Sequence, residues 1–221
     1  MSTRLELTTV QRAIAKRMRF SRSEVPDFSL RVQADMTQAL AARDSGNRDW
    51  TINDLIVRTV AVALREHPKL NGAFEEDAIK LNDRVDVAFA VAAPGALYAP
   101  VIRSADTLSL EAISAESRRL AQSVREGTIQ PVDLRDGTFT VSNLGMFGID
   151  EFDAVINPPQ SGILAVGRIA PQAVVIDDEL SIRKLCALSL TCDHRVVYGA
   201  EAAAFLTCVQ GLLEAPEELT S

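Results

Sequence analysis

The strongest constraint on the fold of this chain is the way its hydrophobic periodicity changes along the 221 residues. Several stretches place apolar side chains at the three- and four-residue spacing of an amphipathic helix. Shorter apolar and β-branched stretches between them are typical of strands. We expect helices at 9–23, 37–42, 51–66, 108–126 and 199–213, and strands at 28–34, 85–93, 101–103, 138–142, 162–167, 173–176 and 182–192. This order predicts an α/β domain with a mixed β-sheet and flanking helices.

Capping residues mark the expected helix starts. Thr8 or Thr9 precedes the first helix, Asn53 is expected to cap the helix at 51–66, and Ser109 caps the next long helix. The elements do not alternate as regular βαβ units, and neither G-x-G-x-x-G nor G-x-x-x-x-G-K-[ST] occurs, so a doubly wound nucleotide-binding fold is not indicated. Because no repeat or low-complexity linker interrupts the chain, we interpret residues 1–221 as a single catalytic domain.

The charge balance limits the partners that the chain can have. Lys and Arg number 23 against 30 Asp and Glu, which gives a formal net charge of -7. Such a chain has no basic field to hold a nucleic acid. No apolar stretch reaches the roughly 20 residues that a membrane span needs, and the first residues do not resemble a secretory signal. We therefore expect a cytoplasmic protein that binds neither nucleic acid nor membranes.

Cysteine and histidine are too scattered to indicate a metal site. Cys186, Cys192 and Cys208 form no C-x-x-C pair, and only His67 and His194 could add an imidazole ligand. We expect no metal, no bound cofactor and reduced thiols.

The segment Ser189–Arg195 carries the most chemical information. An apolar strand runs directly into Asp193, His194 and Arg195, and burying such groups is costly unless they are paired or used. The pattern fits either a surface turn or a general base held at a strand end. The other histidine, His67, lies at a predicted helix end, where a cation suits the helix dipole. His194 is therefore the candidate general base.

A second informative segment is Gly137–Gly148, in which a predicted strand ends at Ser142 and Asn143. The glycines that follow permit close approach of the backbone to a ligand. Ser-Asn is also common turn chemistry, so Ser142 is either a turn former or a hydroxyl donor aimed at an oxyanion. Cys192 offers a rival nucleophile beside His194, although a free cysteine is more often packing than catalyst.

Several segments resemble, in the same order, the catalytic domain of dihydrolipoamide acyltransferases, the cores of 2-oxo acid dehydrogenase complexes. They read R-A-I-A-K-R-M, P-V-I-R-x-A-D, G-T-F-T-V-S-N-L-G-M-F-G-I, I-N-P-P-Q-S-G-I-L-A-V-G and S-L-T-C-D-H-R-V-V-Y-G. The resemblance runs from about Leu7 to Pro216 and implies a chloramphenicol acetyltransferase-like fold. It also implies a homotrimer with active sites between subunits, one subunit bringing His194 of an H-x-x-x-D-G motif and its neighbour bringing Ser142 of S-N-L-G.

The resemblance implies direct acyl transfer from a coenzyme A thioester, with acyl-CoA and a small-molecule or carrier-bound acceptor as partners. His194 would take the proton from the acceptor's thiol or hydroxyl as that group attacks the thioester. Ser142 would stabilise the tetrahedral oxyanion. Residues expected to support the site or to line its acceptor side are Tyr198, Arg12, Asp193, Arg195 and Asn143.

Some features depart from the family pattern. Tyr198 replaces the aspartate of H-x-x-x-D-G. Arg12, which aligns with the arginine that pairs with this carboxylate, therefore either lacks its partner or finds Asp193 or another carboxylate. Asp27 stands where the family often has a histidine before an aromatic residue, and no lipoyl domain is recognised.

These departures favour a stand-alone acyltransferase that places an acetyl or short acyl group on a hydroxyl or thiol of a non-lipoyl acceptor, for example a tetronate-like natural-product intermediate. Dihydrolipoamide is then expected to be a poor acceptor. The alternatives are the dihydrolipoamide-acylating core of a 2-oxo acid dehydrogenase complex and, third, a non-catalytic scaffold. The acidic segment 214–221 contains one large apolar residue, so a trimer is expected rather than a larger cage.

Overall fold

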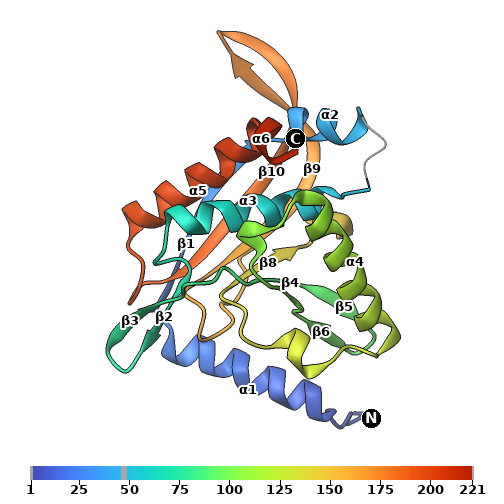
Figure 1. Ribbon diagram of the computed structural model, residues 1–221, viewed down its shortest axis with the longest axis vertical. Coiled ribbons are helices and arrows are strands. Elements are labelled where there is room, and N and C mark those ends of the chain that lie inside the picture. The colour runs from blue at the N-terminus through green and yellow to red at the C-terminus, as the bar shows by residue number, and fades with distance from the viewer. Residues whose placement is uncertain (1, 46–48, 221) are drawn as a thin grey trace.

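The computed structural model describes residues 2–45 and 49–220, and its centre is a six-stranded mixed β-sheet (Figure 1). The strands β4 and β9 both run parallel to β8, which lies between them, and the other neighbours are antiparallel. In spatial order the strands are β1 (Asp27–Asp35), β10 (Glu179–Asp193), β9 (Gly162–Ile176), β8 (Phe139–Asn143), β4 (Val87–Phe89) and β7 (Val101–Ile102). The expected α/β fold with a mixed sheet is confirmed.

Two small hairpins and a set of helices complete the chain. The hairpins pair β2 (Gly72–Glu75) with β3 (Ala78–Leu81), and β5 (Val91–Ala93) with β6 (Ala96–Tyr98). The α-helices are α1 (Thr9–Glu24), α2 (Thr37–Asp44), α3 (Ile52–Glu66), α4 (Leu110–Glu126), α5 (Gly199–Glu214) and α6 (Glu217–Thr220). Short 3-10 turns lie at Ala105–Thr107, Pro131–Leu134 and Gly145–Phe147. No helix in the described ranges is long and apolar enough to cross a membrane.

The main core lies between the sheet and the helices α3 and α5, which pack together over it. Side chains such as Leu55, Val60, Phe205 and Leu206 are almost fully buried there. Burying one large apolar side chain contributes about 1.5–3 kcal/mol, so this stripe fixes both helices on the sheet. The Thr51 hydroxyl, which accepts from the Asp54 backbone, caps α3. The expected cap at Asn53 is therefore wrong, because Thr51 is the last residue with extended backbone before the helix.

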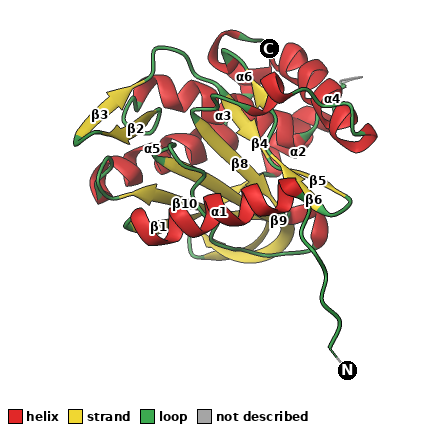
Figure 2. Cartoon of the chain, turned by 90° about the horizontal axis from the view of Figure 1, so that it is seen from below, coloured by secondary structure: helices red, strands yellow, loops and turns green. Residues whose placement is uncertain are grey.

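Helix α1 lies on the other side of the molecule from α3 and α5 and packs much more loosely. Figure 2 shows it in front of the sheet when the molecule is seen from below. Ser21 is its only buried residue, and the Ser21 hydroxyl donates to the Ile156 carbonyl at 2.7 Å. Its apolar residues Val10, Ile14 and Met18 border a cavity instead of a packed core.

The strands around β9 and β10 differ from the sequence-based expectation. The stretches 162–167 and 173–176 form one long strand, and β10 begins at Glu179. Asp177 and Asp178, both with positive φ, make the two-residue turn between them, as a type I′ hairpin requires. The outer part of this pair, residues 168–185, is here called the distal hairpin, and it projects from the body at the top of Figure 1, in orange.

The expected strand at 85–93 is also divided. The backbone N–H of Ala90 still donates to Val141 of β8, but β5 leaves the main sheet to pair with β6. The reason is the turn at Pro94-Gly95, where Gly95 has a φ of 77° and folds β6 back on β5. This hairpin later forms part of the cavity wall.

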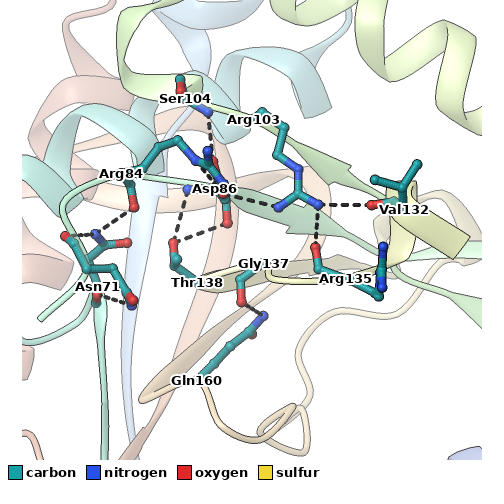
Figure 3. A network of polar contacts seen from close by, with 11 residues as sticks. Asn71, Arg84, Asp86, Arg103, Ser104, Val132, Arg135, Gly137, Thr138 and Gln160 are labelled. Atoms are coloured by element: carbon teal, nitrogen blue, oxygen red, sulfur yellow. Dashed lines mark hydrogen bonds and ion pairs between the residues drawn. The ribbon is translucent and has the colours of Figure 1, made fainter. Parts of the chain in front are cut away.

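A buried carboxylate ties β4 to the entry of β8 (Figure 3). Asp86 is 1% exposed and accepts from Arg84 Nε at 2.8 Å, Arg103 Nη1 at 3.1 Å and the Ser104 backbone N–H at 2.8 Å. Its backbone N–H also donates to the Thr138 hydroxyl at 3.0 Å. Thr138 directly precedes β8, and Arg103 and Ser104 belong to the P-V-I-R-x-A-D segment. Through this network the segment therefore supports the strand that carries Ser142.

Candidate active site

Ser142 lies at the end of β8, half-buried, with its backbone in register with Ala165 of β9. The Asn143 side chain fixes the turn that follows, since its oxygen accepts from the Gly145 N–H at 2.9 Å. A Cβ at Gly145 would lie 2.5 Å from the Gly167 carbonyl oxygen, so only glycine lets this turn pack on β9. The S-N-L-G sequence thus holds the serine at a tightly packed strand end.

Asn143 makes a second contact that links the turn to the main core. Its Nδ2 donates to Asn53 Oδ1 at 3.2 Å, so Asn53 lies beside the site without capping α3. The Asn143 side chain therefore joins the turn after β8 to the start of α3.

A cavity of about 1310 Å³ opens beside Ser142. Apolar residues from α1 and from the β5–β6 hairpin form part of its wall, together with the exposed Met146 and Phe147 of the turn after β8. Arginines from α1 and α4 (Arg17, Arg118 and Arg125) also line it. We call this space the Ser142 cavity; it offers apolar walls, guanidinium groups and one hydroxyl at a strand end.

His194 follows the last residue of β10 and is exposed. Its backbone N–H donates to the Pro26 carbonyl at 2.9 Å. The imidazole packs at a tilt against two aromatic rings, with centroid distances of 4.7 Å to Phe28 and 5.7 Å to Tyr198. The sharp turn after the apolar strand therefore presents the imidazole at the molecular surface.

The structure does not bring Ser142 and His194 together within one chain. His194 is absent from the described residues that line the Ser142 cavity. Strand β9 lies between the two strands that carry them, and Ser142 is level with Ser189, five residues before His194. With strands about 4.8 Å apart and a rise of about 3.3 Å per residue, the two residues are separated by on the order of 20 Å.

Asp193 and Arg195 pair with each other. Asp193 is 2% exposed, and its carboxylate accepts from Arg195 Nη2 at 2.7 Å and from the Arg195 backbone N–H at 3.0 Å. This hydrogen bonding raises the pKa of Arg195. The guanidinium also lies 4.4 Å from the Phe74 ring centroid. Asp193 is thus fully engaged in fixing the turn that bears His194.

Arg12 is exposed and does not reach Asp193. Its guanidinium donates to the Leu7 carbonyl and the Thr9 hydroxyl of its own helix start. No carboxylate among the described residues pairs with it. Of the two alternatives expected from the sequence, the described residues of one chain show the first: Arg12 has no carboxylate partner, and its guanidinium is open to water.

Cys192 does not qualify as a nucleophile in this structure. It is 0% exposed, and burial raises the pKa of its thiol to about 12. The reactive form of cysteine is the thiolate, so near neutral pH this side chain of β10 is a packed group in the core, two residues before His194.

One cluster of possible metal ligands escaped the sequence analysis. Ligand atoms of Glu66, His67 and Cys208 lie within 4.8 Å of one another. Cys208 is far in sequence from the adjacent Glu66 and His67, and the packing of α3 against α5 brings it to them. The His67 ring packs edge-on against Phe205 at 5.7 Å and ends α3, so packing and capping account for this histidine without a metal.

Comparison with known proteins places this geometry among acyltransferases. The family model for 2-oxoacid dehydrogenases acyltransferase (catalytic domain) matches residues 1–221. The dihydrolipoyllysine-residue acetyltransferase component of the pyruvate dehydrogenase complex of Zymomonas mobilis is 37% identical over 96% of this chain and 50% of that protein. The Rickettsia bellii counterpart is 38% identical over 94% of this chain and 51% of that protein. The chain thus spans about half the length of the curated relatives it matches.

Solved structures of dihydrolipoamide acetyltransferases share the fold of this chain. A probable dihydrolipoamide acetyltransferase from Listeria monocytogenes has a TM-score of 0.94 at 33% identity, covering 97% of this chain and 95% of the other. The Azotobacter vinelandii enzyme has a TM-score of 0.93 at 28% identity, covering 100% and 95%. Chloramphenicol acetyltransferase, at 14% identity and a TM-score of 0.56, covers 90% of this chain and 94% of the other. It shares the fold, as the sequence predicted.

The Azotobacter structure belongs to an investigation of a serine, a histidine and an asparagine in that enzyme's catalytic mechanism. That serine and histidine are separated by the same number of positions as Ser142 and His194. The asparagine follows the histidine by four positions, where this chain has Tyr198. Of the three side chains, two are therefore retained here at matching spacing.

The comparisons correct one expectation from the sequence. A stand-alone enzyme acting on a non-lipoyl, natural-product acceptor is the wrong interpretation, because relatives at 36–38% identity over most of the chain are dihydrolipoyllysine-residue acetyltransferases. The exchange at Tyr198 was given too much weight. In the structure that side chain is 54% exposed, so its replacement leaves no buried charge without a partner.

Proposed function

The chain belongs to the family of 2-oxoacid dehydrogenase acyltransferase catalytic domains, and from this premise we propose that it exchanges a short acyl group, such as acetyl, between coenzyme A and a dihydrolipoyl thiol. The observation that carries the proposal is the retention of Ser142 and His194, at matching spacing, in a chain that superimposes on dihydrolipoamide acetyltransferases over its whole length. We propose these two residues as the catalytic pair.

In the proposed reaction the acceptor thiol attacks the carbonyl carbon of the acyl thioester directly. His194 takes the thiol proton as general base, the step for which imidazole is suited near neutral pH. The Ser142 hydroxyl donates a hydrogen bond to the oxyanion of the tetrahedral intermediate. The intermediate then releases the donor as a thiolate, and the imidazolium of His194 returns the proton to it. Transfer in the opposite direction uses the same groups in reverse order.

The Ser142 cavity has the chemistry that coenzyme A needs. Guanidinium groups bind phosphate oxygens in forked hydrogen bonds, and Arg17, Arg118 and Arg125 line this cavity. Its apolar wall suits the pantetheine arm and the acyl chain. We propose that the donor's thioester reaches Ser142 from this side.

The position of His194 supports a homotrimer with active sites between subunits. Within one chain the imidazole is exposed and on the order of 20 Å from Ser142. A complete pair therefore needs a second copy, and a head-to-tail interface that closes into a ring supplies one. We propose that His194 of one subunit enters the Ser142 cavity of the next.

The direct test is transfer from acetyl-CoA to dihydrolipoamide by the purified chain, followed by the appearance of free coenzyme A and S-acetyl dihydrolipoamide. Turnover on the order of 10 per second is typical of enzymes and is the expected outcome. Propionyl-CoA and branched acyl-CoA donors extend the assay to other short acyl groups. A folded, oligomeric protein that transfers none of them would refute the proposal and favour a non-catalytic scaffold.

A further inference from the structure

The imidazole of His194 has no hydrogen-bond partner among the described residues, yet it has close ring neighbours. Phe28 of β1 lies 4.7 Å away with an interplanar angle of 53°, and Tyr198 lies 5.7 Å away at 59°. A general base usually takes its orientation from a polar group behind it. Here the aromatic contacts are what restrict the ring.

The two aromatic residues are anchored in different ways. Phe28 is half-buried in β1, where its backbone pairs with Cys192 of β10. Tyr198 directly precedes α5 and is 54% exposed. Phe28 is therefore fixed by the sheet, whereas the position of Tyr198 depends on the start of the helix and on what holds its ring.

Glu201 and Lys69 hold Tyr198 in place. Glu201 Oε2 accepts from the Tyr198 backbone N–H at 3.0 Å, and Glu201 Oε1 accepts from Lys69 Nζ at 2.6 Å. The same ammonium lies 5.4 Å from the centroid of the Tyr198 ring, within the range of a cation–π contact. Hydrogen bonds from Lys69 and from the Tyr198 backbone lower the pKa of Glu201, so it stays ionised near neutral pH.

We propose that Tyr198 is a positioning residue that orients the His194 imidazole through contact between the two rings. Phe28 supplies the second ring contact of the imidazole, and Lys69 and Glu201 hold the tyrosine in place. The proposal rests on the proposed function of His194 as general base. Tyr198 stands at the same spacing from the histidine as the asparagine of the Azotobacter enzyme. In this proposal its aromatic ring orients the imidazole, and its hydroxyl has no role.

Two substitutions separate the ring from the hydroxyl. Tyr198→Leu removes the aromatic ring but leaves an apolar side chain, and we expect kcat to fall about 3- to 10-fold with little change in KM, the scale of one aromatic pair contact. Tyr198→Phe keeps the ring and should retain kcat within about twofold. Because Tyr198 is mostly exposed, both variants should keep the thermal midpoint and the oligomeric state of the unmodified protein.

Proton NMR gives a readout that does not depend on catalysis. The chain has 2 histidines, so the imidazole signals are few, and His194→Ala assigns them. In the intact oligomer, we expect the Cε1 proton of His194 to shift in Tyr198→Leu and to stay in place in Tyr198→Phe, while the His67 signal, set by Phe205, is unchanged in both.

Each result decides the proposal. An unmoved His194 signal in Tyr198→Leu, or a moved signal with unchanged kcat, would overturn it. Equal losses of kcat in Tyr198→Phe and Tyr198→Leu would assign the effect to the hydroxyl and would also overturn it. If the unmodified protein transfers no acyl group, the proposed function fails, and the NMR shift still shows whether the Tyr198 ring contacts the imidazole in the oligomer.

Discussion

The two regions that carry the candidate catalytic residues differ in how complete they are within one chain. Around Ser142, the strand end, its turn and a cavity of about 1310 Å³ are all supplied by the same polypeptide. Around His194, the backbone turn is fixed by the buried Asp193, which pairs with Arg195, but the imidazole itself is exposed and does not line the Ser142 cavity of its own chain.

This difference shows that one chain can fold both regions completely without bringing the two candidate catalytic residues together. The region around Ser142 has a cavity for a substrate but no candidate base. The region around His194 has a candidate base, but it does not line that cavity. In the proposed reaction, a second copy of the chain brings one region to the other.

Removal of the His194 imidazole should have the largest effect. We expect His194→Ala to lower kcat at least about 100-fold, the scale for loss of a general base, with the fold of the chain retained because the side chain is exposed within its own chain and forms no part of its core. His67→Gln is the matched control, since it removes the other imidazole, and it should keep kcat. Near-normal turnover by His194→Ala would show that the region around His194 does not supply the general base.

Removal of the Ser142 hydroxyl should have the next largest effect. Loss of one oxyanion donor costs about 100-fold in kcat, and an interaction made only in the transition state leaves KM nearly unchanged. Steady-state kinetics of Ser142→Ala at varied acetyl-CoA test this. A rise in KM with unchanged kcat would make Ser142 a ground-state binding group instead.

The distal hairpin provides a test of the need for a second copy. One face of this ribbon carries Val175, Leu180 and Ile182, which are 68%, 82% and 77% exposed. A two-stranded ribbon is marginally stable alone in water, so we expect a neighbouring subunit to cover it. The double change Leu180→Lys and Ile182→Lys should shift the mass in light scattering from trimer toward monomer and reduce activity about 10-fold at low protein concentration.

The opposite face of the ribbon supplies the control for that experiment. Ser181 lies between the two substituted positions but points the other way, as alternate residues of a strand do. Ser181→Lys adds one of the same charges to the opposite face and should leave the mass and the activity unchanged. Trimers that persist in the double variant would show that the distal hairpin is not part of the interface.

The smallest effect is expected at Cys192. If this thiol were a nucleophile, the His194 side would be a complete site in one chain and the comparison would fail. Because burial raises its pKa to about 12, we expect Cys192→Ala to keep kcat within about threefold, with some loss of stability from the missing core atoms. Loss of activity at the level of His194→Ala would reopen the role of the cysteine.

Much of the fold could be predicted from the sequence because its signals are local. The apolar spacing of α3 and the cap at Ser109 needed no knowledge of the rest of the chain. The length of the distal hairpin could not be predicted, because its exposed strands lack the burial pattern that marks a strand in a sheet. The division between β4 and β5 depends on a change of pairing partner, which is also a property of the folded chain.

The candidate site could be predicted only in part. Ser142 and His194 stand in motifs that the sequence shows directly, whereas the partners of Arg12 depend on the folded chain, in which its guanidinium is exposed. The contacts of Tyr198 with His194 and Lys69 join residues from three separate segments, so no spacing rule could reveal them. The predicted non-lipoyl acceptor is wrong because an unusual residue at position 198 need not change the substrate: the side chain is exposed, and an exposed side chain can change at little cost.

The most direct test of a site divided between chains is complementation. Ser142→Ala retains an intact His194, and His194→Ala retains an intact Ser142. The two inactive proteins are mixed in equal amounts, dissociated and reassembled, and acetyl transfer to dihydrolipoamide is measured. If the site is built between neighbouring subunits, about a quarter of the randomly assembled interfaces should pair the intact histidine of one chain with the intact serine of the next. These interfaces should regain activity. Activity of the reassembled mixture no higher than that of the separate variants, with trimers formed, would contradict the account.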